Sequence, residues 1–147
     1  DFIHNHNLLA VGTHDKFVFD KLVEAHGNYP KDTARLKPTE AEILKYYNNV
    51  FAAYKIIFAN IMAEVCGKLD CDYTTVKDAF VKFGRCKDSY LDVNENLKGY
   101  GGMCLPKDVK AMTKLLEKLD IDFDTFKAVD SDNSKLKTTV FNGMRKQ

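Results

Sequence analysis

Apolar residues recur at helical spacing through the middle of the chain, and this pattern predicts its dominant element. Over residues 38–66 the apolar side chains step by three and four positions: Leu44, Tyr47, Phe51, Tyr54, Phe58, Ile61 and Val65. Neither Gly nor Pro interrupts the segment before Gly67, which predicts a helix of about 28 residues, roughly 42 Å long. Because Ile43, Val50 and Ile57 widen the stripe, we expect burial on several sides and a homodimer built on residues 38–66.

Shorter elements are expected on both sides of this helix. Residues 8–12 (LLAVG) form a short apolar run that predicts a single buried strand, which would have to pair with a strand outside this chain or with a second copy. Residues 14–27 predict a helix and residues 28–37 a connector. The later pattern predicts helices over 72–83, 106–119 and about 123–145, and an ordered loop over 85–103. The expected fold class is therefore mainly α with one strand.

Composition narrows the classes of function. With 22 Lys+Arg against 21 Asp+Glu, the net charge of +1 argues against binding driven by nucleic-acid phosphates. No run of 18 consecutive apolar residues suggests a membrane span, and no secretion signal is visible. The four cysteines fit neither a disulfide framework nor a zinc pattern, so we expect no metal and a reduced, cytoplasmic protein. The four histidines, at positions 4, 6, 14 and 26, are interpreted as ordinary surface residues.

The segment from Gly99 to Asp108 (GYGGMCLPKD) is the densest in candidate chemistry. Its three glycines permit close approach of a ligand, and Pro106 marks the start of a helix. Cys104 would then lie at a helix N-terminus beside Lys107, where a nucleophilic thiolate is favoured. The simpler alternative is a glycine-rich turn with a buried Cys104, and with Asp108 as an acid that complements the helix dipole.

A second set of candidates lies on the long helix. Lys45 and Asn49 are four residues apart and so share a face, where an ammonium and an amide could hold an oxyanion. Alone, each could equally be a solvated surface residue. Asn60 stands among Ile57, Phe58 and Ile61, which predicts a buried structural hydrogen bond.

Both sets together resemble the UDP-glucose/GDP-mannose dehydrogenase family. Residues 38–49 (PTEAEILKYYNN), continuing to Asn60, resemble the opening of its central helical domain, and residues 99–108 resemble its active-site cysteine motif. The resemblance implies a helical domain like the C-terminal domain of 6-phosphogluconate dehydrogenase. It divides the chain into residues 1–36, the tail of an N-terminal dinucleotide-binding domain, and residues 37–147, the central dimerisation domain.

The resemblance also implies an NAD-dependent oxidation of a nucleotide sugar at C6, through a thiohemiacetal and a thioester. It implies that Cys104 is the nucleophile and that Lys45 and Asn49 stabilise the developing oxyanion. It also implies that Asp108 orients or deprotonates water. It places Gly99, Tyr100 and Gly101, together with Lys45 and Asn49, at the substrate, and Cys104 to Lys107 near the nicotinamide. Tyr100 and Leu105 favour the UDP-glucose branch over GDP-mannose.

Two departures from the family pattern leave a second hypothesis open. The chain contains no G-x-G-x-x-G, and the family's Asp-x-Arg-Ile-Gly segment has no clear match around residues 85–88. We therefore expect a piece of a longer enzyme that is inactive alone. The alternative is a helical dimerisation or scaffold module without catalysis.

Overall fold

A computed structural model describes residues 7–27, 30–94, 96 and 98–136 of the chain. The chain divides into two compact units, residues 1–47 and residues 48–147. The long helix α2 (Pro38–Lys68) begins in the first unit and continues in the second. Its bounds agree with the predicted helix over 38–66, and Glu40 in its first turn accepts the Lys37 N–H at 2.8 Å.

The first unit contains a small parallel sheet. Strand β1 (Leu8–Gly12) leads through helix α1 (Lys16–His26) to strand β2 (Asp32–Leu36). The two strands pair in parallel, with Leu8 opposite Asp32 and Gly12 opposite Leu36. The prediction of a single strand and of a connector over residues 28–37 is therefore wrong. In β2 only Ala34 and Leu36 are half-buried, and two alternating apolar residues are too weak a signal to predict a strand.

The predicted helix over residues 14–27 is confirmed as α1. The Asp15 carboxylate accepts the Phe17 N–H at 2.7 Å and caps the helix, and Gly27 ends it with φ of 68°. Gly12 closes β1 where the backbone of α2 approaches. A Cβ atom at Gly12 would lie 2.9 Å from the Cβ of Ala41 and 3.2 Å from the Cα of Pro38. The glycine therefore permits the close approach of the first turn of α2.

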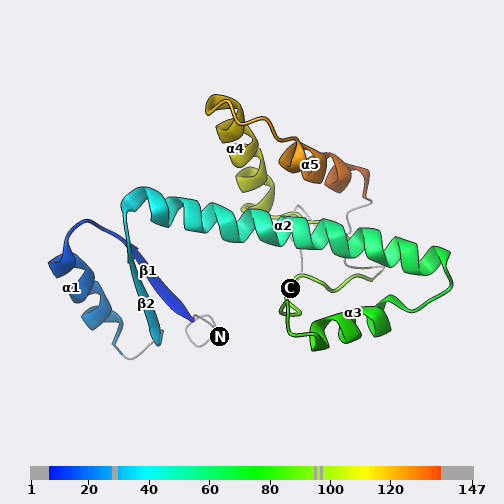
Figure 1. Ribbon diagram of the computed structural model, residues 1–147, viewed down its shortest axis with the longest axis horizontal. Coiled ribbons are helices and arrows are strands. Elements are labelled where there is room, and N and C mark those ends of the chain that lie inside the picture. Colours follow the sequence, from blue (N-terminus) through cyan, green and yellow to red (C-terminus); the bar gives the residue numbers. More distant parts are fainter. Residues whose placement is uncertain (1–6, 28–29, 95, 97, 137–147) are drawn as a thin grey trace. The chain divides into compact units, whose positions relative to one another are not determined.

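The second unit is built on the remainder of α2, with helices α3 (Tyr73–Lys82), α4 (Leu105–Lys118) and α5 (Thr125–Lys135) around it. In Figure 1, α4 and α5 lie on one side of α2 and α3 lies along the other. Four α2 residues form the core with one residue each from the glycine-rich loop, α4 and α5: Val50, Ala53, Ile56, Ile57, Tyr100, Val109 and Val129. The predicted helices over 72–83 and 106–119 and the intervening loop are confirmed.

The last predicted helix is shorter than expected. Helix α5 ends at Lys135, and Leu136 has extended backbone angles, φ −71° and ψ 134°. The sequence pattern continued the helix to position 145, but residues 137–147 lie outside the described part of the chain. Within the described residues, α5 therefore ends at Lys135.

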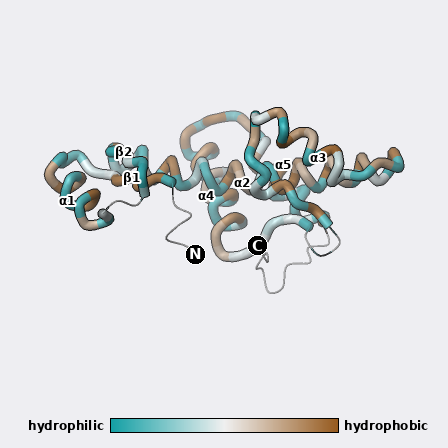
Figure 2. Tube along the Cα trace, turned by 90° about the horizontal axis from the view of Figure 1, so that it is seen from below, coloured by the Kyte–Doolittle hydropathy of each residue, from teal (hydrophilic) through white to brown (hydrophobic). Residues whose placement is uncertain are grey.

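One face of α2 stays exposed in the second unit. Its side chains are between two fifths and about one half exposed: Phe51, Tyr54, Phe58, Ile61 and Val65. Apolar residues, brown in Figure 2, recur along α2. By length and composition α2 could also cross a membrane, which the sequence pattern did not suggest. Buried core helices meet the same criterion of length and composition, and 44% of the apolar window in α2 is buried inside the protein. We interpret α2 as a core helix with one uncovered face.

Candidate active site

Helix α4 begins directly after the glycine-rich loop, and Cys104 is its N-cap residue. The Cys104 side chain is exposed, makes no capping hydrogen bond among the described residues, and is followed by Leu105 and Pro106 in the first turn. The Cys104 carbonyl accepts the Asp108 N–H at 2.9 Å, which closes that turn. The alternative interpretation with a buried Cys104 is therefore wrong, and the sulfur lies at the positive end of the α4 dipole.

Asp108 lies one turn further along α4 in a very different environment. Its side chain is fully buried, and the Asn49 Nδ2 donates to its Oδ2 at 2.6 Å across to α2. The Lys107 ammonium pairs with its other oxygen, Oδ1, also at 2.6 Å. The carboxylate thus meets an amide and a cation, as a buried acid requires. Asp108 points into the unit rather than toward solvent at the helix end.

Tyr100 fixes the glycine-rich loop to α5. The side-chain amide of Asn133 accepts the Tyr100 N–H at 2.7 Å and donates to the Tyr100 carbonyl at 2.9 Å. The phenol is buried against Asp130, with its oxygen 3.5 Å from Oδ1 of that carboxylate. Burial, and then the Asp130 charge, raise the pKa of Tyr100 well above its usual range. Tyr100 therefore acts as an anchor of the loop that carries Cys104.

The predicted buried hydrogen bond of Asn60 is confirmed. Its Nδ2 donates to the Ile56 carbonyl at 2.7 Å, and its Oδ1 accepts the Gly99 N–H at 3.4 Å. The amide thus joins α2 to the start of the glycine-rich loop. Gly99 and Gly102 both have positive φ, 63° and 80°, which residues with a side chain rarely adopt.

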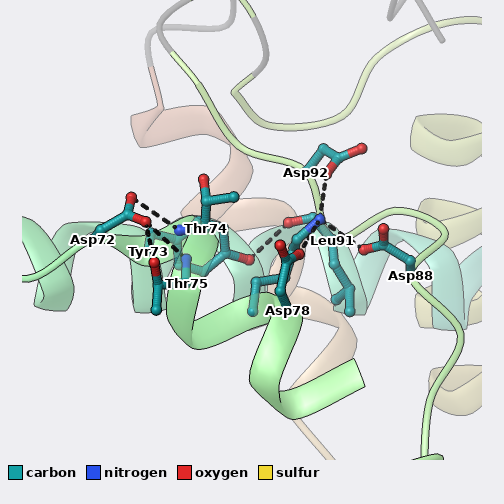
Figure 3. A network of polar contacts seen from close by, with 9 residues as sticks. Asp72, Tyr73, Thr74, Thr75, Asp78, Asp88, Leu91 and Asp92 are labelled. Carbon is teal, nitrogen blue, oxygen red and sulfur yellow. Dashed lines mark hydrogen bonds and ion pairs between the residues drawn. The ribbon is translucent and has the colours of Figure 1, made fainter. Parts of the chain in front are cut away.

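Two lysines hold the preceding loop, and the sequence interpretation missed both. Lys77 of α3 is 9% exposed and pairs with Asp78, Asp88 and Asp92 at 3.3, 2.9 and 2.8 Å. Figure 3 shows the carboxylates of Asp78, Asp88 and Asp92 converging on the Lys77 ammonium. Beside them, the Tyr73 hydroxyl donates to the Leu91 carbonyl at 2.7 Å. Hydrogen bonds to Asp92 and Asp88 raise the Lys77 pKa above its usual range.

Lys55 of α2 binds the same loop. Its ammonium donates to the Ser89 carbonyl at 2.7 Å and lies 5.2 Å from the centre of the Tyr90 ring. Tyr90 itself has a positive φ of 68°. Nothing in the sequence marked these lysines, because each acts on a loop 15 or 34 residues away. Their contacts with Asp88 and Ser89 fix the loop next to residues 85–88, where the family's Asp-x-Arg-Ile-Gly segment has no clear match.

The remaining candidates are placed individually. Lys45 belongs to the first unit, is exposed, and its ammonium lies 5.0 Å from the centre of the Tyr46 ring. Within the second unit the structure brings together Asn49, Lys107 and Asp108, one turn from Cys104. His14 and His26 are exposed as predicted, whereas positions 4 and 6 lie outside the described residues. Over the described part of the chain no cluster of three His, Cys, Asp or Glu side chains could hold a metal ion.

The four thiols differ strongly in exposure. Cys104 and Cys71 are exposed, Cys86 is half-buried and Cys66 is buried. Burial, followed by the contact with Cys71, raises the pKa of the Cys66 thiol. We therefore expect Cys66 to be the least reactive of the four thiols.

Comparison with known proteins places these features in a family. Residues 39–135 match the model of the "UDP-glucose/GDP-mannose dehydrogenase family, central domain". The chain is similar to the UDP-glucose 6-dehydrogenase YwqF of Bacillus subtilis, 29% identical over 121 residues, which are 82% of this chain and 27% of the relative. It is also similar to the UDP-glucose 6-dehydrogenase AglM of Haloferax volcanii, 36% identical over 95 residues, which are 65% of this chain and 21% of the relative.

The fold agrees with this placement. A UDP-glucose dehydrogenase structure from the hyperthermophilic archaeon Pyrobaculum islandicum superimposes with a TM-score of 0.79 at 30% identity, over 88% of this chain and 29% of that one. The chain spans about a quarter of the length of the curated relatives it matches. Since the family model covers both the long helix and the cysteine-bearing loop, this chain belongs to the UDP-glucose/GDP-mannose dehydrogenase family.

Proposed function

We propose that this chain is the central part of an NAD-dependent nucleotide-sugar 6-dehydrogenase that converts the C6 alcohol of UDP-glucose to a carboxylate. The observation that carries the proposal is an exposed thiol, Cys104, at a helix N-terminus one turn before the buried Asp108 and its hydrogen bond from the half-buried Asn49. The names of the similar proteins, UDP-glucose 6-dehydrogenases, support the choice of substrate. Tyr100 and Leu105 of the cysteine motif point the same way.

Cys104 is proposed as the nucleophile. Its thiolate sulfur forms a bond to the C6 aldehyde carbon, and the carbonyl electron pair moves to oxygen to give a thiohemiacetal. The developing oxyanion needs a fixed donor. Asn49 can supply one, because its NH₂ group carries two N–H bonds and the contact with Asp108 uses one. Lys45, four residues earlier on α2, is proposed as a cationic partner.

Asp108 is proposed to act in the hydrolysis of the thioester. Water adds to the C6 carbonyl, the C–S bond breaks, and the electron pair returns to the Cys104 sulfur. Asp108 would orient that water or accept its proton, and its bond to Asn49 would meanwhile fix the amide. Gly99, Tyr100 and Gly101 are proposed to line the sugar. The backbone N–H and carbonyl of Tyr100 already form hydrogen bonds with the Asn133 side chain. We therefore propose that Tyr100 contributes indirectly, by fixing the loop that lines the sugar.

NAD, as the family implies, supplies the oxidising power by accepting a hydride in each oxidation. The described residues of the first unit do not fit its pyrophosphate. The β1–α1–β2 unit is parallel, as in dinucleotide-binding folds, but the N-terminus of α1 is capped by the Asp15 carboxylate, which repels phosphate. We propose that residues 1–36 are the tail of a dinucleotide-binding domain whose phosphate site lies elsewhere in a longer protein. Cys104 and Lys107 are proposed to face the nicotinamide.

The experiment compares the 147-residue chain with the protein made from its complete reading frame. The longer protein should form two NADH for each UDP-glucose, and the chain alone none. Cys104→Ala in the longer protein should abolish uronate formation, whereas Cys86→Ala should retain it. Lack of turnover of UDP-glucose and of GDP-mannose by the complete protein would instead favour a non-catalytic dimerisation module.

A further inference from the structure

The end of α2 brings two cysteines together. The Leu69 N–H binds the carbonyls of Val65 and Cys66, each at 3.1 Å, and the Cys71 N–H binds the Cys66 carbonyl at 3.0 Å. Asp70 between them has a positive φ of 55°. A bond from the sixth residue back to the first across a left-handed residue is the Schellman motif of helix ends. Cys66 and Cys71 occupy the two positions whose side chains touch in that motif.

The backbone bond also limits how far apart the two residues can be. With standard bond lengths on either side of a 3.0 Å N···O contact, the Cα atoms of Cys66 and Cys71 are at most about 7 Å apart. That is within the reach of a disulfide. The Cys71 thiol donates a hydrogen bond to the Cys66 carbonyl oxygen at 3.5 Å, and the two thiols lie close enough to affect each other's titration. The Cys71 side chain therefore lies over the turn that joins it to Cys66.

The two sulfurs differ in access to solvent. Cys71 is exposed, and Cys66 is only 4% exposed. Burial raises the pKa of the Cys66 thiol. We therefore expect Cys66 to react after Cys71 has been oxidised. Cys86 and Cys104 lie in other parts of the second unit, in the loop after α3 and at the start of α4. Within this pair, a soluble oxidant therefore reaches Cys71 before Cys66.

We propose that Cys66 and Cys71 are a redox-active pair that closes to an intramolecular disulfide in response to peroxides. The Cys71 thiolate attacks a peroxide oxygen, the O–O bond breaks, and Cys71 becomes a sulfenic acid while the peroxide leaves as alcohol or water. The Cys66 sulfur then attacks the Cys71 sulfur, and the sulfenic oxygen leaves as water. One peroxide is reduced by two electrons, and the two thiols are oxidised by two. A thiol reductant reverses the reaction.

The positions of the tryptic sites make the test direct. Cleavage after Lys68 separates Cys66 and Cys71, so the disulfide appears as residues 56–68 linked to residues 69–77. After treatment of the purified protein with hydrogen peroxide and alkylation, this linked pair should be at least tenfold more abundant than any pair containing Cys86. It should disappear after reduction. Its absence, or equal yields in native protein and in guanidinium, would overturn the proposal.

Two controls exclude other origins of the linked pair. In a mixture of ¹⁵N-labelled and unlabelled protein, the linked peptides should be all heavy or all light, and mixed pairs would show that the bond forms between molecules. Cys71→Ser, at an exposed site, should abolish the pair, whereas Cys86→Ser should leave it unchanged. Phenylarsine oxide, which binds close dithiols, should protect Cys66 and Cys71 from alkylation in wild type and Cys86→Ser; unprotected thiols would contradict the geometry.

Discussion

A single turn of α4 holds a thiol in water and a carboxylate in the core. Cys104 is the N-cap residue of the helix and is exposed, while the Asp108 side chain has no solvent exposure. Cys104 follows directly on the glycine-rich loop, whereas Asp108 receives a hydrogen bond from the Asn49 amide of α2. The Cys104 side chain thus lies at a helix N-terminus, the end of a helix whose first backbone N–H groups can donate to an oxyanion.

We therefore predict that Cys104 is the fastest of the four thiols to react. Iodoacetamide labelling between pH 6 and 9, followed by peptide mass spectrometry, should rank Cys104 first and the buried Cys66 last. Cys71 is the critical comparison, since it is also exposed but lies in the turn between α2 and α3, next to the Asp72 carboxylate. Faster labelling of Cys71 or Cys86 at pH 7 would remove the physical support for Cys104 as nucleophile.

The Asn49–Asp108 contact gives a second prediction at this scale. Asn49→Ala removes a donor from a fully buried carboxylate, which should lower the free energy of unfolding by about 2 kcal/mol. Asn48→Ala, at the exposed neighbour whose Nδ2 donates to the Asn49 Oδ1 at 3.3 Å but does not reach Asp108, should lower it by only about 0.5 kcal/mol. Urea denaturation measures both. Equal effects of the two variants would show that the contact does not stabilise Asp108.

Sequence reasoning found some of these residues and missed others for a physical reason. Asn60 was predictable because an amide inside an apolar stripe must find a partner. Asn133 was not, because it lies on the polar helix α5 where an amide is ordinary, and its role depends on a loop 33 residues away. Lys77 was hidden in the same way by its position on a short helix with few buried residues.

At the scale of elements, local signals decide the outcome. Asp72, Pro106 and Gly84 mark helix ends through chemistry confined to one turn, and the helices they bound were predicted within a few residues. Strand β2 has no such signal. Its partner β1 is 24 residues earlier in register, so only the tertiary pairing shows that residues 32–36 are a strand.

The cap of α3 gives a prediction that depends on pH. The Thr75 hydroxyl and N–H and the Thr74 N–H donate to Asp72 and lower its pKa. A lowered carboxyl pKa contributes stability that is present above the unfolded value of about 3.9 and lost as the pH falls through the folded value. Asp72→Ala should therefore lower the Tm at pH 7 by about 2–5 °C and have a smaller effect at pH 2–3.

Asp72→Asn is the matched control for that cap. An amide oxygen still accepts the N–H groups, so most of the stability at pH 7 should remain, while the acid-dependent loss should become smaller. Calorimetric scans of the three proteins between pH 2 and 7 provide the comparison. If Asp72→Asn keeps the full acid dependence, other carboxyl groups cause it.

For the whole molecule, the exposed face of α2 is the feature that demands a partner. Five large apolar side chains share it in the second unit: Phe51, Tyr54, Phe58, Ile61 and Val65. They follow the three-and-four spacing at which two helices interdigitate. Burial of such a stripe contributes a favourable free energy of about 25 cal/mol for each Å² of apolar area removed from water. The free-energy cost of association must be subtracted from it. A second copy of the chain offers the same stripe and can cover it by two-fold symmetry.

We therefore predict a homodimer at micromolar concentration, built mainly on residues 38–66. Sedimentation equilibrium should give about twice 16.7 kDa, and a single 16.7 kDa species would contradict the prediction. Ile61→Glu places a charge in the stripe at a position 48% exposed in one chain, so it should weaken the dimer at least tenfold without unfolding the helix. Lys110→Glu, an exposed change on α4 that also makes the chain more acidic, should leave the mass unchanged. If both variants dissociate the dimer, net charge rather than the α2 stripe governs the association.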